Sequence, residues 1–597
     1  MQTSGTTSGV KLAQPPGLYL LFIVEMWERF SYYGMRALLV LYLIAGAYSV
    51  KLPGGEQAQF ATSSVVQVTT AEGVTTGTVT RVFDDAKSGT AVPTLLLKVR
   101  ATDGTSTNKN IPLASITAVK TEGKGNPGPG WNKESANTLY GWYTGMAYLL
   151  PIVGGLIADK FIGTHRSMIV GGLLIALGHI TLAVAGIGGA DHTMAGQSIF
   201  IAGLALIVIG TGHFKPCVSV MVGQLYGPDD PRRDGGFTLF YMGINIGAFL
   251  CAFVCGTLGE QVGWHWGFGS AAVGMLLGLG VYMVFREKYL HGIGLAPEGK
   301  RNSSGFFLAG GVVLAALVGL LFNGGFFGAL ENGVRSAMST SAGAWGIPIA
   351  LVVATALMIG WLLSMQAPQD RGTVASILVF IGFNTFFWMA FEQAGSSLNL
   401  FAEDNTSRVI AGWEVPTSWF QSINAFCVFM MAPLFAAMWS RMGAKGRDPK
   451  QATKIGLGLL LLGAGYLFMV FGAKHASGGL RVSMFWLVAT YFFHTMGELC
   501  LSPTGLAFVT KAAPVKFVSL LMGIWFLSSF LAGVLGGYLA ATTEAIEAGT
   551  MSLPWYGWFR IGGQADYYLL FVIVSVVLGV IALASSPFFT RVLKEKA

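Results

Sequence analysis

Charged residues are scarce in this sequence. Only 11% of the 597 residues are Asp, Glu, Lys or Arg, whereas 53% are apolar, and the mean hydropathy is +0.60. An ordinary soluble domain carries about 25% charged residues. The scarcity excludes a soluble globular protein and predicts an integral membrane protein. The length allows about a dozen membrane helices of roughly 20 residues each, with room for an inserted domain.

Cysteine is also scarce, and its placement indicates neither a disulfide framework nor a metal site. All five cysteines fall in apolar runs expected to cross the membrane, and their spacing matches no set of metal ligands. The sequence contains neither paired intramembrane aspartates nor an HExxH pattern, so we expect no membrane protease, no enzyme and no bound cofactor. The cysteines are Cys217, Cys251, Cys255, Cys427 and Cys500.

Basic residues exceed acidic ones, giving a formal net charge of +8, but most lie in short loops between apolar runs. Short cytoplasmic loops are enriched in Lys and Arg, so we expect both termini in the cytoplasm and no nucleic-acid partner. The first sixteen residues carry Lys11 as their single charge and have no small-residue cleavage site. No cleaved signal peptide is therefore expected.

About fourteen apolar runs are long enough to span a bilayer, in the order six, two, six. They lie at about 17–48, 139–158, 167–188, 197–222, 237–258 and 265–286, then 305–323 and 345–364, then 372–394, 418–440, 453–472, 483–509, 517–541 and 566–590. The fold expected is an all-α polytopic membrane protein of two six-helix bundles with two extra linker helices. Its segments are residues 1–48, 49–135, 136–290, 291–370 and 371–597.

One segment, residues 49–135, departs from the helical pattern. It is rich in Thr, Ser, Val, Gly and Lys, and four stretches alternate weakly between apolar and polar residues, at 64–70, 76–83, 93–101 and 111–119. We predict a small β-rich insert on the extracytoplasmic side. It contains no catalytic constellation, so a structural or partner-contacting role is expected.

The first apolar run carries charges where a lipid-facing helix would carry none. Glu25, Glu28, Arg29, Tyr32, Tyr33 and Arg36 recur with helical spacing on an arc of roughly 140°. Each charge would cost about 2.5–3.5 kcal/mol or more against lipid, so this face must look into protein or a water-filled cavity. A transport site is the prediction, and a purely structural cluster of salt bridges is the alternative.

The other ionisable residues expected within the membrane are few, and their signs are complementary. Basic groups lie in the first half of the chain and carboxylates in the second, so pairs can form between the halves and be broken by a proton or a charged ligand. Burial disfavours an ionised carboxylate that has no nearby cation. These residues are His179, His213, Lys215, Glu392, His494 and Glu498; we expect the three histidines to be satisfied core residues.

Three motifs resemble those of the proton-dependent oligopeptide transporters, a family of the major facilitator superfamily. They are EMWERFSYYG at residues 25–34, FTLFYMGINIGAF at 237–249 and GGLIADKFIG at 154–163. The resemblance covers about residues 17–48 and 137–595, and the insert lies outside it. It implies the major facilitator fold in a bacterial inner membrane, and import of di- and tripeptides with protons by alternating access. The partners it implies are peptides, protons and lipid, with the monomer as the working unit.

Site residues follow from the resemblance, position by position. It implies that Arg36 and Lys215 hold the peptide carboxylate, and that Glu498 with Asn245 and Asn424 holds the amino terminus and backbone. It further implies side-chain pockets formed by Tyr32, Tyr33, Tyr148, Trp388, Trp525 and Ser529, proton coupling by Glu25, Glu28, Arg29 and Glu392, and gating pairs Arg36–Glu392 and Lys215–Glu498.

Two departures and two alternative functions accompany this interpretation. Cys217 and Ala425 stand where the family often has Asn and Pro, which puts the local pocket shape in question. The alternatives are a family member that carries nitrate or another small anion, and a peptide sensor that does not transport. Glu498 favours the peptide, because a carboxylate suits an ammonium group.

Overall fold

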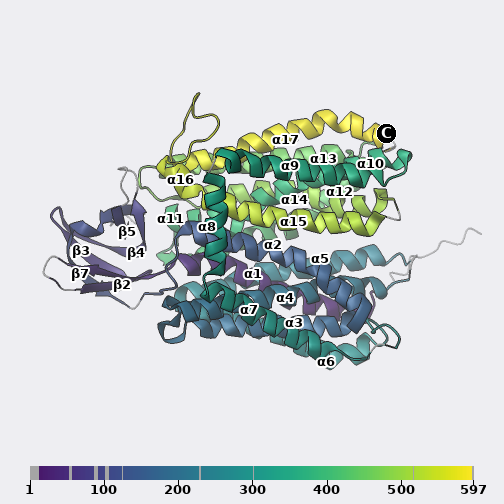
Figure 1. The fold of residues 1–597 in the computed structure, drawn as a ribbon, viewed down its shortest axis with the longest axis horizontal. Coiled ribbons are helices and arrows are strands. Elements are labelled where there is room, and N and C mark those ends of the chain that lie inside the picture. Colours follow the sequence, from purple (N-terminus) through teal and green to yellow (C-terminus); the bar gives the residue numbers. More distant parts are fainter. Residues whose placement is uncertain are drawn as a thin grey trace, which may run out of the picture.

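The computed structural model describes residues 13–52, 55, 57–85, 92–100, 106–123, 125–227, 230–299, 301–339, 341–514 and 517–593. Two helical bundles lie side by side along most of its length, and a β-rich insert projects from one end (Figure 1). We call this the insert end. The helix that ends at Val592 finishes at the opposite end, which we call the terminal end (Figure 1).

The two bundles have six long helices each among the described residues. The N-terminal bundle contains α1 (Pro16–Ile44), α2 (Lys133–Ile157), α3 (Gly163–Ala185), α4 (Met194–Gln224), α5 (Arg233–Cys251) and α6 (Trp264–Tyr289). The C-terminal bundle contains α10 (Pro368–Phe391), α12 (Gln421–Ala444), α13 (Gln451–Ala476), α14 (Phe485–Ala512), α15 (Val518–Ala541) and α17 (Gln564–Val592).

Apolar composition accounts for these helices. Ten segments within the described part of the chain are long and apolar enough to cross a membrane, judged by length and composition alone. One of them, Lys133–Ala185, contains both α2 and α3. The expectation of a helical membrane protein with a β-rich insert is therefore confirmed in outline.

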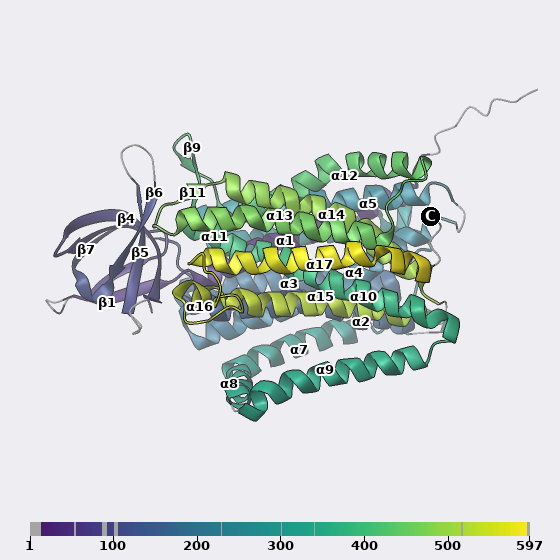
Figure 2. The same cartoon turned by 90° about the horizontal axis from the view of Figure 1, so that it is seen from above.

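A separate layer of helices joins the two bundles. α7 (Ser304–Asn323) packs against α3 and α4, and α9 (Ser341–Ser364) continues towards α10. Between them α8 (Phe326–Ser339) runs across the long axis near the insert end (Figures 1 and 2). The sequence predicted two linker helices, so α8 is an addition. Its charged and polar residues had interrupted the apolar pattern.

The insert is a small antiparallel β-structure between α1 and α2. A hairpin pairs β1 (Ala47–Lys51) with β2 (Gln57–Ala61), beside a five-stranded sheet in the order β6-β5-β4-β3-β7. The sheet strands are β3 (Val65–Thr70), β4 (Gly73–Asp85), β5 (Val92–Arg100), β6 (Ser106–Pro112) and β7 (Ile116–Glu122). Val66, Val68, Leu95 and Leu97 are fully buried in its core.

Two expectations about this region were wrong in detail. The stretch 111–119 is not one strand, because a short 3-10 turn, Leu113–Ser115, separates β6 from β7. The first helix was expected to reach residue 48, but α1 ends at Ile44 and β1 begins at Ala47. Apolar residues continue across both boundaries, so hydropathy alone did not reveal them.

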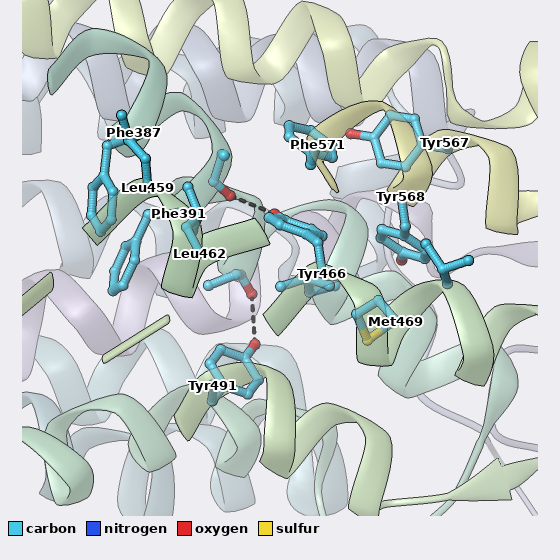
Figure 3. Close-up of a cluster of buried hydrophobic side chains, with 14 of the residues drawn as sticks. Phe387, Phe391, Leu459, Leu462, Tyr466, Met469, Tyr491, Tyr567, Tyr568 and Phe571 are labelled. Atoms are coloured by element: carbon cyan, nitrogen blue, oxygen red, sulfur yellow. Dashed lines mark hydrogen bonds between the residues drawn. The ribbon is translucent and has the colours of Figure 1, made fainter. Parts of the chain in front are cut away.

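Aromatic packing fixes the insert end of α10, where two candidate site residues lie. Tyr466 of α13 donates a hydrogen bond of 2.6 Å to the Ala390 carbonyl, and it stacks on Phe571 of α17 with ring centroids 4.6 Å apart (Figure 3). Tyr491 of α14 donates to the Ala394 carbonyl at 3.4 Å. These buried hydroxyls satisfy carbonyls where α10 ends, which holds the following turn in place.

Candidate functional site

The charged face of α1 forms a compact buried cluster. Arg29 Nε lies 2.8 Å from Glu25 Oε1 and 2.8 Å from Glu28 Oε2, and all three side chains are almost fully buried. Arg29 donates a hydrogen bond to Glu25, whereas neither oxygen of Glu28 accepts one from the described residues. Two carboxylates thus share one guanidinium, an arrangement in which a proton or a second cation balances the charge.

Lys215 supplies a cation near this cluster from α4. It interacts electrostatically with Glu25, Glu28 and Arg29, and its Nζ lies 3.8 Å from the ring centroid of Tyr148 on α2. A cation over an aromatic face is stabilised without being neutralised. The amine therefore keeps its capacity to bind a carboxylate.

Arg36 joins the two bundles. Its Nη2 lies 2.7 Å from Glu392 Oε2, its Nη1 donates to Glu392 Oε1 at 3.4 Å, and its Nε donates to the Tyr140 hydroxyl at 2.8 Å. Glu392 begins the short 3-10 turn that follows α10. The guanidinium fork is matched to a carboxylate, so this contact fixes orientation as well as charge. The structure thus places the predicted Arg36–Glu392 gating pair in contact.

The predicted Lys215–Glu498 pair is not formed in this conformation. Both residues are among those that the structure describes, and no ion pair is present between them. Glu498 of α14 instead accepts a hydrogen bond of 2.9 Å from Asn424 of α12, which also donates to Thr495 at 3.0 Å. One predicted pair is therefore closed near the insert end, while the other is open.

Aromatic residues surround these charges. Tyr33 lies beneath Arg36, with the guanidinium carbon 5.7 Å from the ring centroid, and its ring meets Tyr32 edge-on at 5.2 Å. Tyr32 in turn stacks on Tyr143 of α2 at 6.4 Å. Trp388 donates from its indole nitrogen to Asn384 at 3.1 Å, one turn earlier on α10. These rings give the site broad apolar walls with polar edges.

Three predicted substrate residues have weaker structural support. Asn245 lies on α5, and its side-chain amide donates to the Tyr241 carbonyl of the same helix at 3.0 Å. Trp525 and Ser529 lie on α15 and are half-buried. Trp525 packs at the edge of an apolar cluster that includes Ile381 and Leu521. Among the residues that the structure describes, no hydrogen bond or ion pair links these three to the charged residues.

The three intramembrane histidines lie outside the charged cluster. His179 Nε2 is 2.6 Å from the Ser31 hydroxyl, and His213 Nδ1 is 3.0 Å from the Ser167 hydroxyl. His494 packs on Tyr466, with ring centroids 4.6 Å apart. All three are buried. Each therefore has a local packing or hydrogen-bond role in this structure.

Sequence reasoning missed two residues that hold the site. Tyr140 accepts the Arg36 hydrogen bond. Gln393 is fully buried beside Glu392 and makes several hydrogen bonds. The Gln393 amide donates to the Gly536 carbonyl at 3.0 Å, while its oxygen accepts from Tyr567 at 2.9 Å and from Ser397 at 2.8 Å. The polarity of Gln393 within an apolar run was the available signal.

The site as a whole is suited to binding a zwitterion and moving protons. It contains cations and carboxylates on facing bundles, aromatic walls and pairs that compete for partners. Among the described residues, no group of three or more His, Cys, Asp or Glu side chains is arranged to hold a metal ion. The charged residues of the site are joined by ion pairs and hydrogen bonds.

A family comparison matches most of the chain. The sequence profile described as the POT family covers residues 165–559. Among named relatives, the peptide transporter YePEPT of Yersinia enterocolitica is 34% identical over 558 residues, covering 91% of each chain. The di-/tripeptide transporter of Lactococcus lactis subsp. cremoris is 31% identical, covering 98% of this chain and 97% of the relative. These relatives are named as transporters rather than as enzymes.

Solved structures give the same picture. A crystal structure of a peptide transporter POT in complex with sulfate has a TM-score of 0.68 and 31% identity, covering 97% of this chain and 96% of the other. A POT family transporter in complex with 5-aminolevulinic acid has a TM-score of 0.67 and 25% identity, covering 96% and 97%. The helical arrangement described above is thus shared over nearly the whole of each chain.

Proposed function

Since the chain belongs to the POT family, we propose that it imports di- and tripeptides together with protons by alternating access between its two bundles. The observation that carries the proposal is the buried Arg36–Glu392 pair, which joins the bundles near the insert end while Lys215 and Glu498 remain apart. One closed and one open pair is the arrangement expected of a transporter that faces one side at a time.

Peptide binding rests on two cations from the N-terminal bundle and a carboxylate from the C-terminal bundle. Arg36 and Lys215 hold the peptide carboxylate, and Glu498 holds the amino terminus, with Asn424 and Asn245 on the peptide backbone. The aromatic side chains and Ser529 line permissive pockets for peptide side chains. Fixed contacts to the peptide ends with adaptable walls support broad specificity. The aromatic residues are Tyr32, Tyr33, Tyr148, Trp388 and Trp525.

Proton coupling rests on the carboxylates that compete for cations. A proton on Glu25 or Glu28 leaves Arg29 matched to the remaining carboxylate and frees Lys215 for the peptide. A proton on Glu392 weakens its pair with Arg36. Both events bias the same equilibrium between the two open states, which is how proton entry and peptide entry become coupled. The proton is the coupling ion, and no cofactor is needed.

We also propose how many helices span the membrane and how the protein is oriented in it. We place fourteen spanning helices in a bacterial inner membrane, namely the twelve bundle helices with α7 and α9. Long helices of about 20 residues or more support this number. Lys and Arg in the short loops at the terminal end support cytoplasmic termini and an extracytoplasmic insert. The monomer contains both halves of the site and is the proposed working unit.

The test is transport by the purified protein in proteoliposomes. We expect acid-driven dipeptide accumulation, and for Glu392→Gln we expect driven uptake to fall at least about tenfold while counterflow stays within about twofold. Counterflow needs binding and alternation but no proton gradient. Dipeptide accumulation that ignores an imposed gradient in active wild-type protein would contradict the coupling.

Competition separates the peptide from the two alternatives. Unlabelled dipeptide should displace labelled dipeptide, and nitrate should not, because nitrate lacks the ammonium group that Glu498 is proposed to hold. Nitrate competition would favour the anion carrier. Peptide binding without counterflow would favour the sensor.

A further inference from the structure

The β-rich insert is part of the N-terminal half of the chain, but it makes charged contacts with the C-terminal half. Arg81 of β4 lies 2.9 Å from Glu544 Oε1 of α16 (Thr543–Ala548) and 3.5 Å from Asp404 Oδ2 of α11 (Ser397–Asn405). Lys98 of β5 forms an ion pair with Glu414 of β10 (Trp413–Glu414). Two strands of the insert thus reach the loops that close the insert end of the C-terminal bundle.

Backbone contacts extend this junction. Thr107 of β6 faces Leu480 in an isolated antiparallel bridge, and the Asn108 amide nitrogen donates to the Gly479 carbonyl at 2.7 Å. Arg481 donates from Nε to the Asn108 side chain at 2.9 Å and from its backbone nitrogen to Ser106 at 3.2 Å. We call the contacts of Arg81, Lys98, Thr107 and Asn108 with the C-terminal half the docking interface.

The docking interface is polar and separable from the apolar cores. The hydrophobic cluster of the insert consists of insert residues alone, among them Val50, Leu52 and Phe60. A cavity of about 240 Å³ lies where the insert, α1, α6 and the loop after α11 meet, lined by Lys98, Glu260 and other residues. Because the docking interface consists of polar contacts and lies beside a cavity, it can separate without exposing an apolar core.

The stem of the insert is fixed to the N-terminal bundle. The backbone nitrogens of Gly128 and Gly130 donate to the Ala45 carbonyl at 3.1 and 2.7 Å, and that of Trp131 donates to Leu43 at 2.7 Å. Asn126 bonds the Gly259 carbonyl with its amide at 2.8 Å and accepts from the Trp264 indole at 3.0 Å. The insert therefore cannot follow the C-terminal bundle when the bundles separate at this end.

The stem and the docking interface hold the insert to different bundles. If the insert end opens during transport, the stem holds the insert on one bundle while the docking interface binds it to the other. The contacts that can part are those of the docking interface, since the stem is closed by five backbone and side-chain hydrogen bonds around α1 and α6. We propose that the β-rich insert is a second gate at the insert end, whose docking interface must break each time that end opens.

This inference rests on the proposed alternating access, and it assigns the insert a role in the same cycle. The gate acts beyond the Arg36–Glu392 pair, at the outer surface of the two bundles. A second contact between the halves lies beside it, where Glu260 of the N-terminal bundle accepts hydrogen bonds from the backbone nitrogens of Thr417 and Ser418 at 2.7 and 2.8 Å. Opening must break this contact as well.

A reversible cross-link tests the gate directly. Thr107→Cys with Leu480→Cys places two thiols on facing residues across the docking interface. Oxidation should lower dipeptide counterflow at least about tenfold, and reduction should restore it, because a locked interface removes the open population. Each single variant, treated identically, should transport normally. Unchanged counterflow in fully cross-linked protein would overturn the proposal.

A matched control lies within the insert. Gln67→Cys with Thr76→Cys joins facing residues of β3 and β4 and spans no junction between the halves. This cross-link should form and leave counterflow unchanged. Loss of counterflow in the control as well would mean that stiffening the insert, rather than holding it to the C-terminal half, stops transport, and would also overturn the gate.

A spectroscopic readout separates this inference from the proposed function. If wild-type protein transports no peptide, the proposed function fails. The gate is then tested by electron–electron distance measurements between spin labels at exposed Glu72 of the insert and Trp558 of the C-terminal half. A second, longer distance that oxidation abolishes supports the gate. A single distance that oxidation does not change overturns it.

Discussion

Arg36 makes more contacts than a simple positive charge requires. Its guanidinium meets both oxygens of Glu392 and the hydroxyl of Tyr140, so it joins α1, α2 and the turn after α10 at one point. A lysine would supply the charge but not the planar fork. The geometry of this residue, as well as its charge, therefore sets how firmly the two bundles close.

This geometry predicts the effect of two substitutions. Arg36→Lys should lower the initial rate of proton-driven dipeptide uptake at least about tenfold, because the bidentate contact and the tyrosine contact are both lost. Tyr140→Phe removes one hydrogen bond and should cost about fivefold. Uptake rates at matched protein levels in proteoliposomes measure both. Wild-type uptake by Arg36→Lys would contradict this account of the closed pair.

The sequence revealed the charged residues of the site but not what holds them. Glu25, Glu28 and Arg29 were found because charge on an apolar helix is conspicuous, and helical spacing put them on one face. Tyr140 and Gln393 were not found, because their partners lie far away in the chain: Arg36 is 104 residues from Tyr140, and Tyr567 is 174 residues from Gln393. Contacts of that range follow from the packing of helices, which periodicity does not encode.

At the scale of elements, α2 and α15 cross closely between the two bundles near the insert end. A Cβ atom on Gly141 would lie 2.7 Å from the Cα atom of Gly537, and one on Gly145 would lie 2.8 Å from the Phe530 carbonyl oxygen. These separations leave no room for a side chain. Closure of the insert end therefore depends on glycine at this crossing as well as on the Arg36–Glu392 pair.

Gly141→Ala should consequently favour opening of the insert end. The added methyl group meets backbone rather than a movable side chain, so α2 and α15 must move apart. Distances between spin labels at exposed Ser135 and Thr550 should lengthen. Gly382→Ala on α10 is the matched control, because its Cβ would meet nothing within 4 Å. An unchanged distance in Gly141→Ala would show that the crossing does not limit opening.

Helices and strands were predicted well where a single sequence pattern, such as a long apolar run, dominates. The long apolar runs became helices within a few residues of their expected bounds, because a bilayer-length apolar run has few other solutions. The insert was harder, since weak alternation over 111–119 concealed the turn at Leu113–Ser115. The amphipathic α8 was missed because hydropathy selects spanning helices.

At the scale of the whole molecule, the order of the chain explains why the insert can act between the halves. It emerges between α1 and α2, the helices that carry Arg36 and Tyr140, and its strands reach across to the C-terminal loops. Lys133, at the start of α2, adds an ion pair of 2.6 Å with Asp404 at the same junction. The insert is thus connected to the two helices that carry these site residues. When those helices move as the insert end opens, the insert and the site move together.

The docking interface has its own dependence on pH. Partial burial raises the pKa of the Glu414 carboxyl, but Arg408, Lys98 and Arg481 outweigh burial and hold that pKa below its ordinary value. The ionised carboxylate therefore stabilises docking above the ordinary glutamate pKa of about 4.3, and that contribution is lost as the pH falls through the lowered value. Acid in the range that drives transport therefore leaves Glu414 ionised.

Titration of Glu414 should therefore not change the distance between labels at Glu72 and Trp558 from about pH 7.5 to about pH 5.5, and it should weaken docking only near or below about pH 4. Any lengthening in the milder range comes from opening driven by the buried carboxylates of the site, so it should be equally large in the wild type and in Glu414→Gln. Glu414→Gln lacks one docking ion pair and should show more of the longer distance already at neutral pH. Lengthening between pH 7.5 and 5.5 that occurs in the wild type but is absent in Glu414→Gln would contradict this prediction, because it would mean that protons release the insert through Glu414 itself.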